Sequence, residues 1–325
     1  MRLLVLPFGD AACASTHYRV LQYLDMLKND GIECDVLAPG RMPPPKEIES
    51  YDAVLVQKKL FPAHQVRKLR SNAKRLLFDI DDATWNPHGR THSWLTRWRT
   101  HRRLKTIVRA ADLCLVANNY LGNHLQSLGA RPCVVPMALN EKEWPEPNPR
   151  TTAEQIRIGW SGAPANLRYL EDLESILHKV LNRHRTASLA IFCGERPKFK
   201  SDLPYTHLPW QKGGEYEAVK TFNIGLLPLP MDAFSQGKSP IKALQYMAVG
   251  IPVVATPASG ALEIGDSQSG IQFAYTHEQW LQLLVDLIKN HEHRSSHGVA
   301  ARHAFVNGYT ASRVYTKWVK LITQS

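Results

Sequence analysis

The residues best suited to chemistry in this sequence are two cations near position 240. Lys238 and Lys242 flank Ser239 and Pro240, residue types that favour the position just before a helix and its first turn. A helix N-terminus carries unpaired N–H groups and partial positive charge, so two lysines beside it predict a seat for a phosphate or diphosphate. The alternative is an ordinary surface helix whose lysines are solvated.

The helix that must hold these lysines is expected to end at Gly250. Its spacing leaves Lys242 and Gln245 side by side on one face. A buried strand is predicted directly afterwards, over 252–255. The apolar residues recur at three- and four-residue intervals and predict a buried face, made of Ile241, Leu244, Met247 and Ala248.

The segment from Lys242 to Thr256 resembles the donor site of GT-B glycosyltransferases, in particular the retaining enzymes of glycosyltransferase family 4. It reads Lys-x-x-Gln-Tyr-Met-Ala-x-Gly-x-Pro-Val-Val-Ala-Thr. The family carries two glutamates here, of which the second usually bonds the nucleotide ribose and the first the sugar ring. Gln245 and Gly237 occupy those positions, so both carboxylates are absent. Gln245 still offers an acceptor and a donor to a ribose hydroxyl, whereas Gly237 offers no side chain.

Three other stretches of the second half resemble the same family. The turn within 158–166 is the one that closes over the donor phosphates in the family, and a tight turn that needs glycine for its geometry is the alternative. The end of the strand at 191–195 corresponds to the place near the nucleotide base, and 223–229 to the strand that leads into the donor loop. The resemblance therefore implies donor contacts from Ser161, Gly162, Glu195, Lys238, Ser239, Ile241, Lys242 and Gln245.

In the first half, a predicted apolar strand ends in three carboxylates, Asp79, Asp81 and Asp82. Asp-x-Asp holds manganese in the other large glycosyltransferase fold, but GT-B enzymes generally bind donors without a metal, so we expect no metal. Many family members place a catalytic histidine where Asp81 and Asp82 stand, and a carboxylate there would orient an acceptor hydroxyl or accept its proton. The alternative is that Asp82 caps a helix or forms a turn, with Asn86 and Pro87 downstream.

The loop after the first strand occupies the place of the family's glycine-rich loop, although it has only one glycine. Ser15, His17 and Arg19 follow in it and are expected to contact the donor phosphate or the acceptor. Ser15 or Thr16 is alternatively a cap for the next helix. His17 is alternatively an ordinary polar residue.

Composition describes a soluble globular chain that needs a negatively charged partner. The chain has 325 residues, 44% of them hydrophobic and 21% charged, with a formal net charge of +11. Nucleotide sugars, polyphosphate-linked lipids, anionic membranes and nucleic acids all fit that sign. Five scattered cysteines without a C-x-x-C pair indicate a reducing cytosol and no zinc site. We expect a cytoplasmic protein, with peripheral association at the inner face of a membrane as the alternative.

A basic amphipathic helix is predicted within 91–112, with tryptophans near its start. Packing on its own sheet with a solvated basic face is one interpretation, and contact with an anionic membrane is a second. Single-stranded nucleic acid ranks third, because no nucleic-acid-binding motif accompanies the helix, and we expect no nucleic-acid partner. The residues that carry the pattern are Trp94, Leu95, Arg97, Trp98, Arg99, Arg102, Arg103, Lys105, Ile107, Val108 and Arg109.

Strands alternate with helices along the whole chain, which predicts an α/β protein with parallel sheets. With the resemblance, this implies the GT-B architecture, two doubly wound Rossmann-like domains facing across a cleft. The expected division is an acceptor domain at 1–140, a proline-rich linker at 141–154, a donor domain at 155–309 and a helix at 310–325 that crosses back. Strands are predicted at 3–7, 32–38, 53–57, 75–80, 113–117, 133–137, 155–160, 187–192, 223–227 and 252–255, with a helix at 16–30.

The resemblance implies a metal-independent glycosyltransferase that moves a hexose-like sugar from a nucleotide diphosphate sugar to a hydroxyl of a glycan or lipid-linked acceptor. Retention at the anomeric carbon is expected, and no cofactor beyond the donor substrate. Because both motif glutamates are replaced, a non-catalytic GT-B protein that binds a nucleotide sugar or glycan for another transferase is the alternative. A protein that binds anionic surfaces through its basic first domain is a further one.

Overall fold

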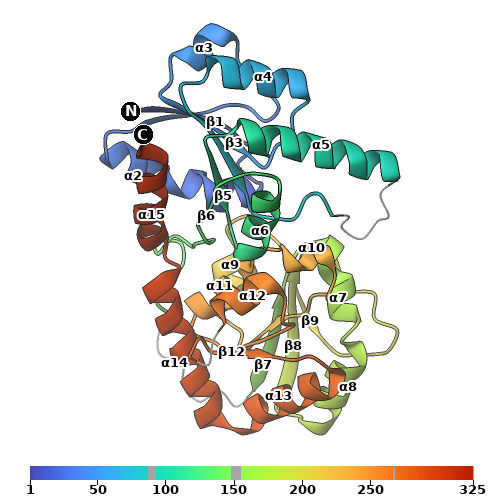
Figure 1. Cartoon of the computed structure of the whole chain (residues 1–325). Helices are drawn as coiled ribbons and strands as arrows, with labels where there is room; N and C mark the ends of the chain where they lie inside the picture. Colours follow the sequence, from blue (N-terminus) through green and yellow to red (C-terminus); the bar gives the residue numbers. More distant parts are fainter. Residues whose placement is uncertain (87–92, 148–154, 266–267, 325) are drawn as a thin grey trace. The chain divides into compact units, whose positions relative to one another are not determined.

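The chain forms two compact units, seen in a computed structural model that describes residues 1–86, 93–147, 155–265 and 268–324 (Figure 1). Unit 1 comprises Met1–Ala138, Asp232–Ser239 and Ala311–Ser325, and unit 2 comprises Leu139–Met231 and Pro240–Thr310. The expected division differs from this one at 232–239, which belongs to unit 1. Residues 148–154 of the expected linker lie outside the described residues, and the part before them belongs to unit 2.

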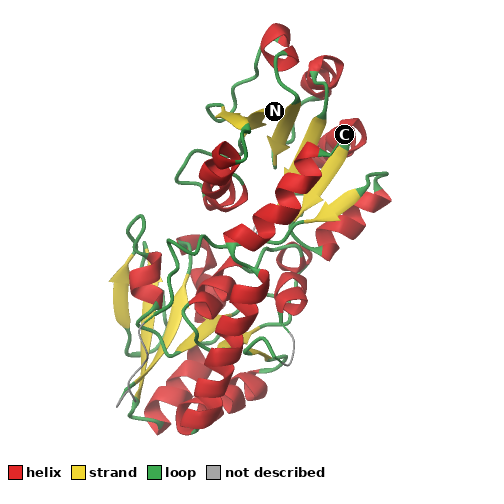
Figure 2. Ribbon diagram, turned by 90° about the vertical axis from the view of Figure 1, so that its left-hand side faces the viewer, coloured by secondary structure: helices red, strands yellow, loops and turns green. Residues whose placement is uncertain are grey.

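Unit 1 is built on a parallel six-stranded sheet in the order β2-β1-β3-β4-β5-β6. Strands β3 and β4 are buried along their whole length, as expected of a parallel sheet with helices on both faces, an arrangement that Figure 2 shows. The predicted strands are confirmed to within a few residues. Their bounds are β1 Arg2–Leu6, β2 Glu33–Val36, β3 Ala53–Gln57, β4 Leu76–Ile80, β5 Leu113–Val116 and β6 Pro132–Val134.

The single helix predicted over 16–30 is wrong, because three short helices occupy that stretch. Val20 leaves the helical region with φ −133°, and its neighbour Arg19 turns inward to Asp79. Gly31 follows the last of the three helices with φ +71°, as a helix stop requires. The helices of unit 1 are α1 Ala14–Arg19, the 3₁₀ helix η1 Leu21–Tyr23, α2 Leu24–Asn29, α3 Pro45–Glu49, α4 Ala63–Asn72, α5 Trp94–Ala110, α6 Asn119–Ser127, α10 Ala233–Gln236 and α15 Ala311–Thr323.

The C-terminal helix α15 is part of the unit 1 core. Trp318 is 1% exposed, and its ring stacks on that of Tyr23 with centroids 5.2 Å apart. Arg75, just before β4, donates to the carbonyl oxygens of Leu321 and Ile322 at 2.8 and 2.7 Å. The sheet of unit 1 is thus covered by a helix from the far end of the chain.

Unit 2 has a second parallel sheet in the order β12-β11-β10-β7-β8-β9. The edge strands β9 (Thr206–Pro209) and β12 (Ile271–Phe273) were not predicted, because they are short and carry no run of buried apolar residues. The other strands are β7 Ile156–Ser161, β8 Ala187–Cys193, β10 Ile224–Leu227 and β11 Val253–Ala255. The helices are the 3₁₀ helix η2 Pro164–Asn166, α7 Leu167–Glu171, α8 Glu174–Arg183, α9 Glu215–Val219, α11 Ile241–Ala248, α12 Ser259–Ile264, α13 His277–Lys289 and α14 His291–Gly308.

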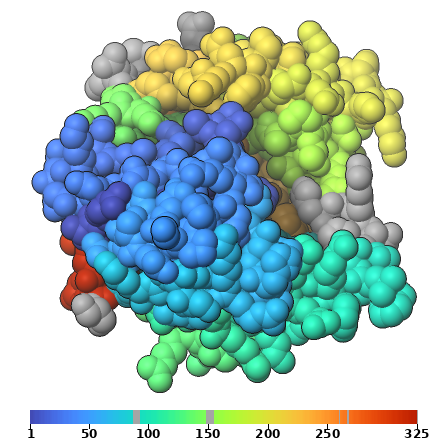
Figure 3. All heavy atoms as spheres, turned by 90° about the horizontal axis from the view of Figure 1, so that it is seen from above, coloured from blue at the N-terminus to red at the C-terminus, as the bar shows by residue number. Residues whose placement is uncertain are grey.

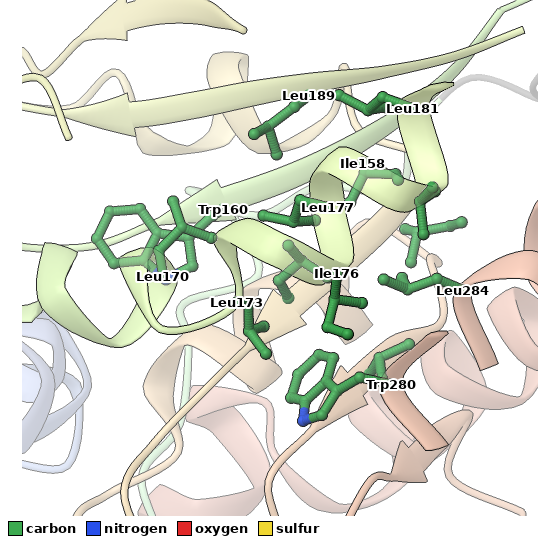
Figure 4. Close-up of a cluster of buried hydrophobic side chains, with 14 of the residues drawn as sticks. Ile158, Trp160, Leu170, Leu173, Ile176, Leu177, Leu181, Leu189, Trp280 and Leu284 are labelled. Carbon is green, nitrogen blue, oxygen red and sulfur yellow. The ribbon is translucent and has the colours of Figure 1, made fainter. Parts of the chain in front are cut away.

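A separate hydrophobic core fixes the sheet of unit 2 (Figure 4). Ile158 and Leu189 come from the central strands, and Ile176 and Leu177 from α8. Trp280 of α13 completes the cluster and is 4% exposed. Each unit therefore buries its own apolar side chains, as independent domains do.

Helix α11 ends as predicted but begins differently. Gly250 has φ +67° and donates to Met247, while Ile251 donates to Tyr246, which is the Schellman pattern of a glycine stop. The cap predicted for Ser239 is wrong: Pro240 holds the N-cap position without a side-chain bond. Buried residues also surround most of the helix instead of forming one face.

No helix among the described residues is long and apolar enough to cross a membrane.

Candidate functional site

A buried cation joins two carboxylates at the carboxyl ends of β3 and β4 in unit 1. Lys58 follows β3, and its Nζ lies 3.0 Å from Asp81 Oδ1 and 2.5 Å from Asp82 Oδ2. The two strands are parallel neighbours, so residues just past their ends meet at one edge of the sheet. Sequence reasoning missed Lys58; a charged residue shortly after the apolar run 53–56 was the available signal.

Asp81 is held from three sides. Ser15 donates its hydroxyl to Asp81 Oδ2 at 2.5 Å, and Lys58 donates to Ser15 Oγ at 3.1 Å. The backbone carbonyl of Asp81 accepts from the Ser239 hydroxyl at 2.5 Å. The predicted site residues Ser15, Asp81 and Ser239 are therefore brought together, but both hydroxyls are used to fix Asp81 rather than left for a ligand.

The two carboxylates differ in electrostatic state. Burial favours the neutral form of Asp81, but attraction to Lys58 and the Ser15 hydrogen bond outweigh it and lower the pKa of Asp81. Burial and the negative charge of Asp81 raise the pKa of Asp82. Only 4% of the Asp81 side chain is exposed, against 22% for Asp82. Asp82 is thus the carboxylate that an incoming group can reach.

Lys58 and Lys238 make the other half of this charged group. Burial lowers the pKa of Lys58, but Asp81 and Asp82 more than offset it, so that its pKa is raised. Burial also lowers the pKa of Lys238, where repulsion from Lys58 opposes attraction to Asp82. Lys58 has φ +56°, which costs a non-glycine residue of order 1–3 kcal/mol. The ion pairs of the Lys58 ammonium group with both carboxylates offset this backbone strain.

Arg19 does not face a ligand. Its guanidinium pairs with Asp79, with Nε 3.1 Å from Oδ2, and donates to the carbonyl of Val135 at 2.6 Å. Burial lowers the pKa of Arg19, but Asp79 more than offsets it, so the pKa is raised. The predicted phosphate or acceptor contact of Arg19 is therefore contradicted by its geometry: at 3% exposure, the residue ties β4 to the loop after β6.

Other predicted residues of unit 1 lie nearby or in ordinary positions. His17 is half-buried, with its ring edge-on to Tyr18. Neither Ser15 nor Thr16 caps α1, because Cys13 is at the N-cap position without a side-chain bond. The turn alternative for Asp82 is supported by the backbone, because Thr84 N donates to the Asp82 carbonyl at 2.8 Å and Asn86 N to the Ala83 carbonyl at 2.9 Å; Pro87 lies outside the described residues.

The segment 232–239 packs so closely on unit 1 that position 237 has no room for a side chain. A Cβ on Gly237 would lie 2.5 Å from Ala83 Cβ and 3.0 Å from Leu121 Cδ2. Asn118 donates to the Gly237 carbonyl at 3.2 Å. The glutamate expected from the resemblance is therefore excluded by this packing, because its side chain would overlap the loop after β4.

In unit 2, Tyr246 joins α11 to the carboxyl ends of two central strands. Its Oη accepts from Ser161 N at 2.9 Å and donates to the Leu226 carbonyl at 3.2 Å. Its ring fills the space where Gly225 has no Cβ, which would lie 2.5 Å away. The sequence showed Tyr246 only as one position of a motif and did not predict its bonds to the two strands.

Ser161 and Lys242 stand at the same edge of the unit 2 sheet. Ser161 Oγ is buried without a hydrogen-bond partner among the described residues, which is costly unless a ligand bonds it. Lys242 Nζ donates to Gln245 Oε1 at 3.0 Å, as the predicted pairing requires. The charges of Glu195 and Lys242 both act on the pKa of Cys193 at the end of β8, which burial raises.

The remaining residues predicted to contact the donor differ in their exposure to solvent. Glu195 is exposed and Ile241 is half-buried. Gln245 is only 1% exposed. Gly162 lies against the ring of Trp160, where a Cβ would come within 2.4 Å, so its turn requires glycine. No group of three or more His, Cys, Asp or Glu side chains suited to a metal occurs in the part of the chain that the structure describes.

Solved structures resemble this chain over its full length. Anabaena Alr3699/HepE in complex with UDP and glucose has a TM-score of 0.72 at 10% identity and covers 99% of both chains. Sucrose-phosphate synthase from Thermosynechococcus elongatus has a TM-score of 0.73 at 13% identity, covering 99% of this chain and 98% of that one. An alpha-glucosyltransferase in complex with UDP and a 13-mer DNA has a TM-score of 0.67 at 13% identity and covers 100% of both.

This chain has the GT-B fold. No family model and no curated protein sequence matches it, and identities of this size establish the fold alone. Within the GT-B fold, the two groups of polar residues lie where doubly wound sheets bind their ligands, outside the carboxyl ends of the strands.

Proposed function

We propose that this GT-B protein is a glycosyltransferase that moves a sugar from a nucleotide diphosphate sugar to an acceptor hydroxyl, in glycan or glycolipid synthesis. The observation that carries the proposal is the unpartnered, buried hydroxyl of Ser161 at the end of β7. Lys242, at the start of α11, supplies a cation in the same unit. Solved neighbours that contain UDP support a nucleotide as the ligand class.

The donor diphosphate is assigned to unit 2. The partial positive charge at the start of α11 and the ammonium group of Lys242 stabilise negative charge on the departing diphosphate. Ser161 Oγ donates to a phosphate oxygen, which satisfies its missing hydrogen bond. These groups supply the positive charge from the protein, so the proposed transfer is independent of a metal, and it proceeds with retention at the anomeric carbon.

The acceptor hydroxyl is assigned to Asp82 in unit 1. Its raised pKa makes it a better proton acceptor than a fully solvated carboxylate, because basicity near the working pH favours general-base action. Asp81 acts as a positioning residue: its Lys58 and Ser15 contacts fix the loop that carries Asp82. The sequence predicted a catalytic role for both Asp81 and Asp82, and the proposal keeps that role for Asp82 alone.

The test is thermal unfolding of the purified protein with UDP, GDP, ADP, CMP and dTDP in turn, with and without Mg²⁺ or Mn²⁺. A ligand that binds the native state adds about 2.7 kcal/mol to the free energy of unfolding at a hundredfold excess over its dissociation constant, and so raises the midpoint. One nucleotide should stabilise the protein without metal, and Lys242→Ala should weaken its binding. Lys289→Ala, at an exposed position of unit 2, is the matched control and should leave binding unchanged.

Absence of any nucleotide effect, or equal binding by the Lys242→Ala and Lys289→Ala variants, contradicts the assignment of the donor. A second candidate follows from the packing at Gly237, which leaves no space for the carboxylate that grips the sugar ring in the resembling family. In this second function, the protein binds a nucleotide sugar for another transferase and does not itself transfer the sugar. Donor binding with neither hydrolysis nor transfer across a panel of acceptors would establish this second function.

A further inference from the structure

Helix α5 exposes a large apolar surface at its start. Trp94 is 73% exposed, Leu95 55% and Trp98 53%. Tryptophan is rarely left in water at such fractions, and an exposed cluster of large apolar residues marks an interaction surface. In Figure 3 the turquoise segment at the start of α5 stands at the margin of unit 1.

This surface is distinct from the face with which α5 packs on its own unit. The buried residues Leu104, Ile107 and Val108 lie in the second half of the helix. Leu104 is about 120° around the helix axis from Trp98, at 3.6 residues per turn. Helix α5 therefore has two apolar faces: one packs on its own unit, and the other is more than half exposed.

The charge around the exposed face has one sign. No Asp or Glu occurs from Ala83 to Ala111, and Arg102 stacks over the Trp98 ring at 4.6 Å. Helix α4, which packs beside α5, also lacks acidic residues. Exposed cations on this pair of helices are Arg67, Arg97, Arg99, Arg102 and Arg109.

We propose that the start of α5 docks on an anionic lipid surface, with Trp94, Leu95 and Trp98 inserted at the headgroup boundary. Tryptophan and leucine beside arginines are the residues with which helices lie in that boundary. Arginines on the flanks bind the phosphates of anionic lipids, whose surface potential attracts them. A soluble polyanion would use the arginines but gain nothing from the inserted indoles, so the exposed apolar face favours the lipid.

The test is co-sedimentation with vesicles of phosphatidylcholine alone and of phosphatidylcholine with phosphatidylglycerol, without nucleotide. Binding should require the anionic lipid and fall with added salt. The double variant Trp94→Ser with Trp98→Ser should lower vesicle binding by about tenfold or more. Arg99→Glu with Arg102→Glu should lower it by a similar factor. Because all four side chains extend into solvent, the unfolding midpoints should stay within a few degrees of the unchanged protein.

Matched controls lie in unit 2, where Trp210 is 48% exposed and Arg196 and Lys289 are exposed cations. Trp210→Ser, and Arg196→Glu with Lys289→Glu, should bind vesicles like the unchanged protein. Three results would each overturn the inference: no vesicle binding, equal loss in the controls, or binding that salt abolishes but the tryptophan variants do not affect. The last would indicate a soluble polyanion. Nucleotide binding is measured separately, so this inference stands or falls independently of the proposed transfer.

Discussion

One buried lysine acts on the charge states of both Asp81 and Asp82. Lys58 faces two aspartates, and no second described lysine or arginine lies within ion-pair distance of Asp81 or Asp82. Asp81 receives the Ser15 hydroxyl as well and stays ionised, whereas Asp82 carries the repulsion between the two carboxylates. Adjacent residues of one type thus acquire different properties, as unequal environments dictate.

Asp82→Asn should abolish most transfer without unfolding the protein. General-base action contributes about 10²–10⁴-fold to rate, so turnover should fall by that factor. A raised pKa means that folding disfavours the charged carboxylate, so a neutral side chain should keep or raise the free energy of unfolding at pH 7. Activity assays and urea denaturation measure both effects. Asp202→Asn, at a 99% exposed side chain, is the control; equal activity of the two variants would contradict the role of Asp82.

Lys58→Met should destabilise the protein by about 3–5 kcal/mol at pH 7, because it leaves two buried carboxylates without their cation. In the unchanged protein the lowered pKa of Asp81 contributes stability above its unfolded pKa of about 3.9, and this is lost as pH falls through the folded pKa. Protonation relieves the unpaired charge in the variant, so the two unfolding free energies should converge below about pH 4.

Lys59→Met is the matched control for that series, since the neighbouring side chain is half-buried and pairs with neither aspartate. It should differ little from the unchanged protein at any pH. A constant gap between Lys58→Met and the unchanged protein from pH 7 to pH 3 would show that the loss comes from packing and not from charge.

At the scale of elements, the close fit of the segment 232–239 on unit 1 sets what the site can contain. Asn118 and Tyr120 donate to carbonyls of this segment, at Gly237 and Ala233. Ser239 bonds the backbone of Asp81. The segment is therefore part of unit 1, although it directly precedes helix α11 of unit 2 in sequence.

Gly237→Ala should cost about 1–3 kcal/mol of stability, because an added methyl group must displace Ala83 or the segment itself. It should also lower activity, since the Ser239 bond to Asp81 depends on the same fit. The free energy of unfolding, measured by denaturation, and the turnover rate should both fall. Gly308→Ala is the control: a Cβ there meets nothing within 4 Å, so an unchanged or slightly higher stability is expected. Equal stability of the two variants would refute the close fit.

At the scale of the molecule, the protein consists of two units with separate cores. The unit 1 core runs from Leu3 to Ile322 and contains residues of α15, while the unit 2 core lies within 156–288. The chain enters and leaves each unit more than once. The core of unit 1 therefore cannot form fully until the C-terminal helix α15 packs against it.

Trp318→Ala should lower the stability of unit 1 by about 3–5 kcal/mol and leave unit 2 unchanged. Calorimetry should show one transition that moves to lower temperature and one that does not. Trp280→Ala, in the unit 2 core, should give the reverse pattern. A common shift of both transitions in either variant would show that the two units unfold as one.

The sequence determined most of the strands and the C-terminal end of α11, because short apolar runs and a glycine stop are local signals. Strand β3 coincides with its predicted residues, and Gly250 ends its helix as expected. The resemblance of the segment from Lys242 to Thr256 to GT-B glycosyltransferases likewise implied the fold, which the solved structures confirm. The short edge strands β9 and β12 gave no such signal.

Only the tertiary structure decided which charges meet. Lys58 and Asp82 are 24 residues apart, and Arg19 and Asp79 are 60 apart, distances over which no local pattern operates. The sequence likewise does not explain why position 237 has no carboxylate; the explanation is the contact with Ala83, which leaves no space for a side chain there. Ion pairs and close packing depend on which strand ends lie side by side, so topology, and not residue type, paired Arg19 with Asp79 in the core and Lys58 with Asp82.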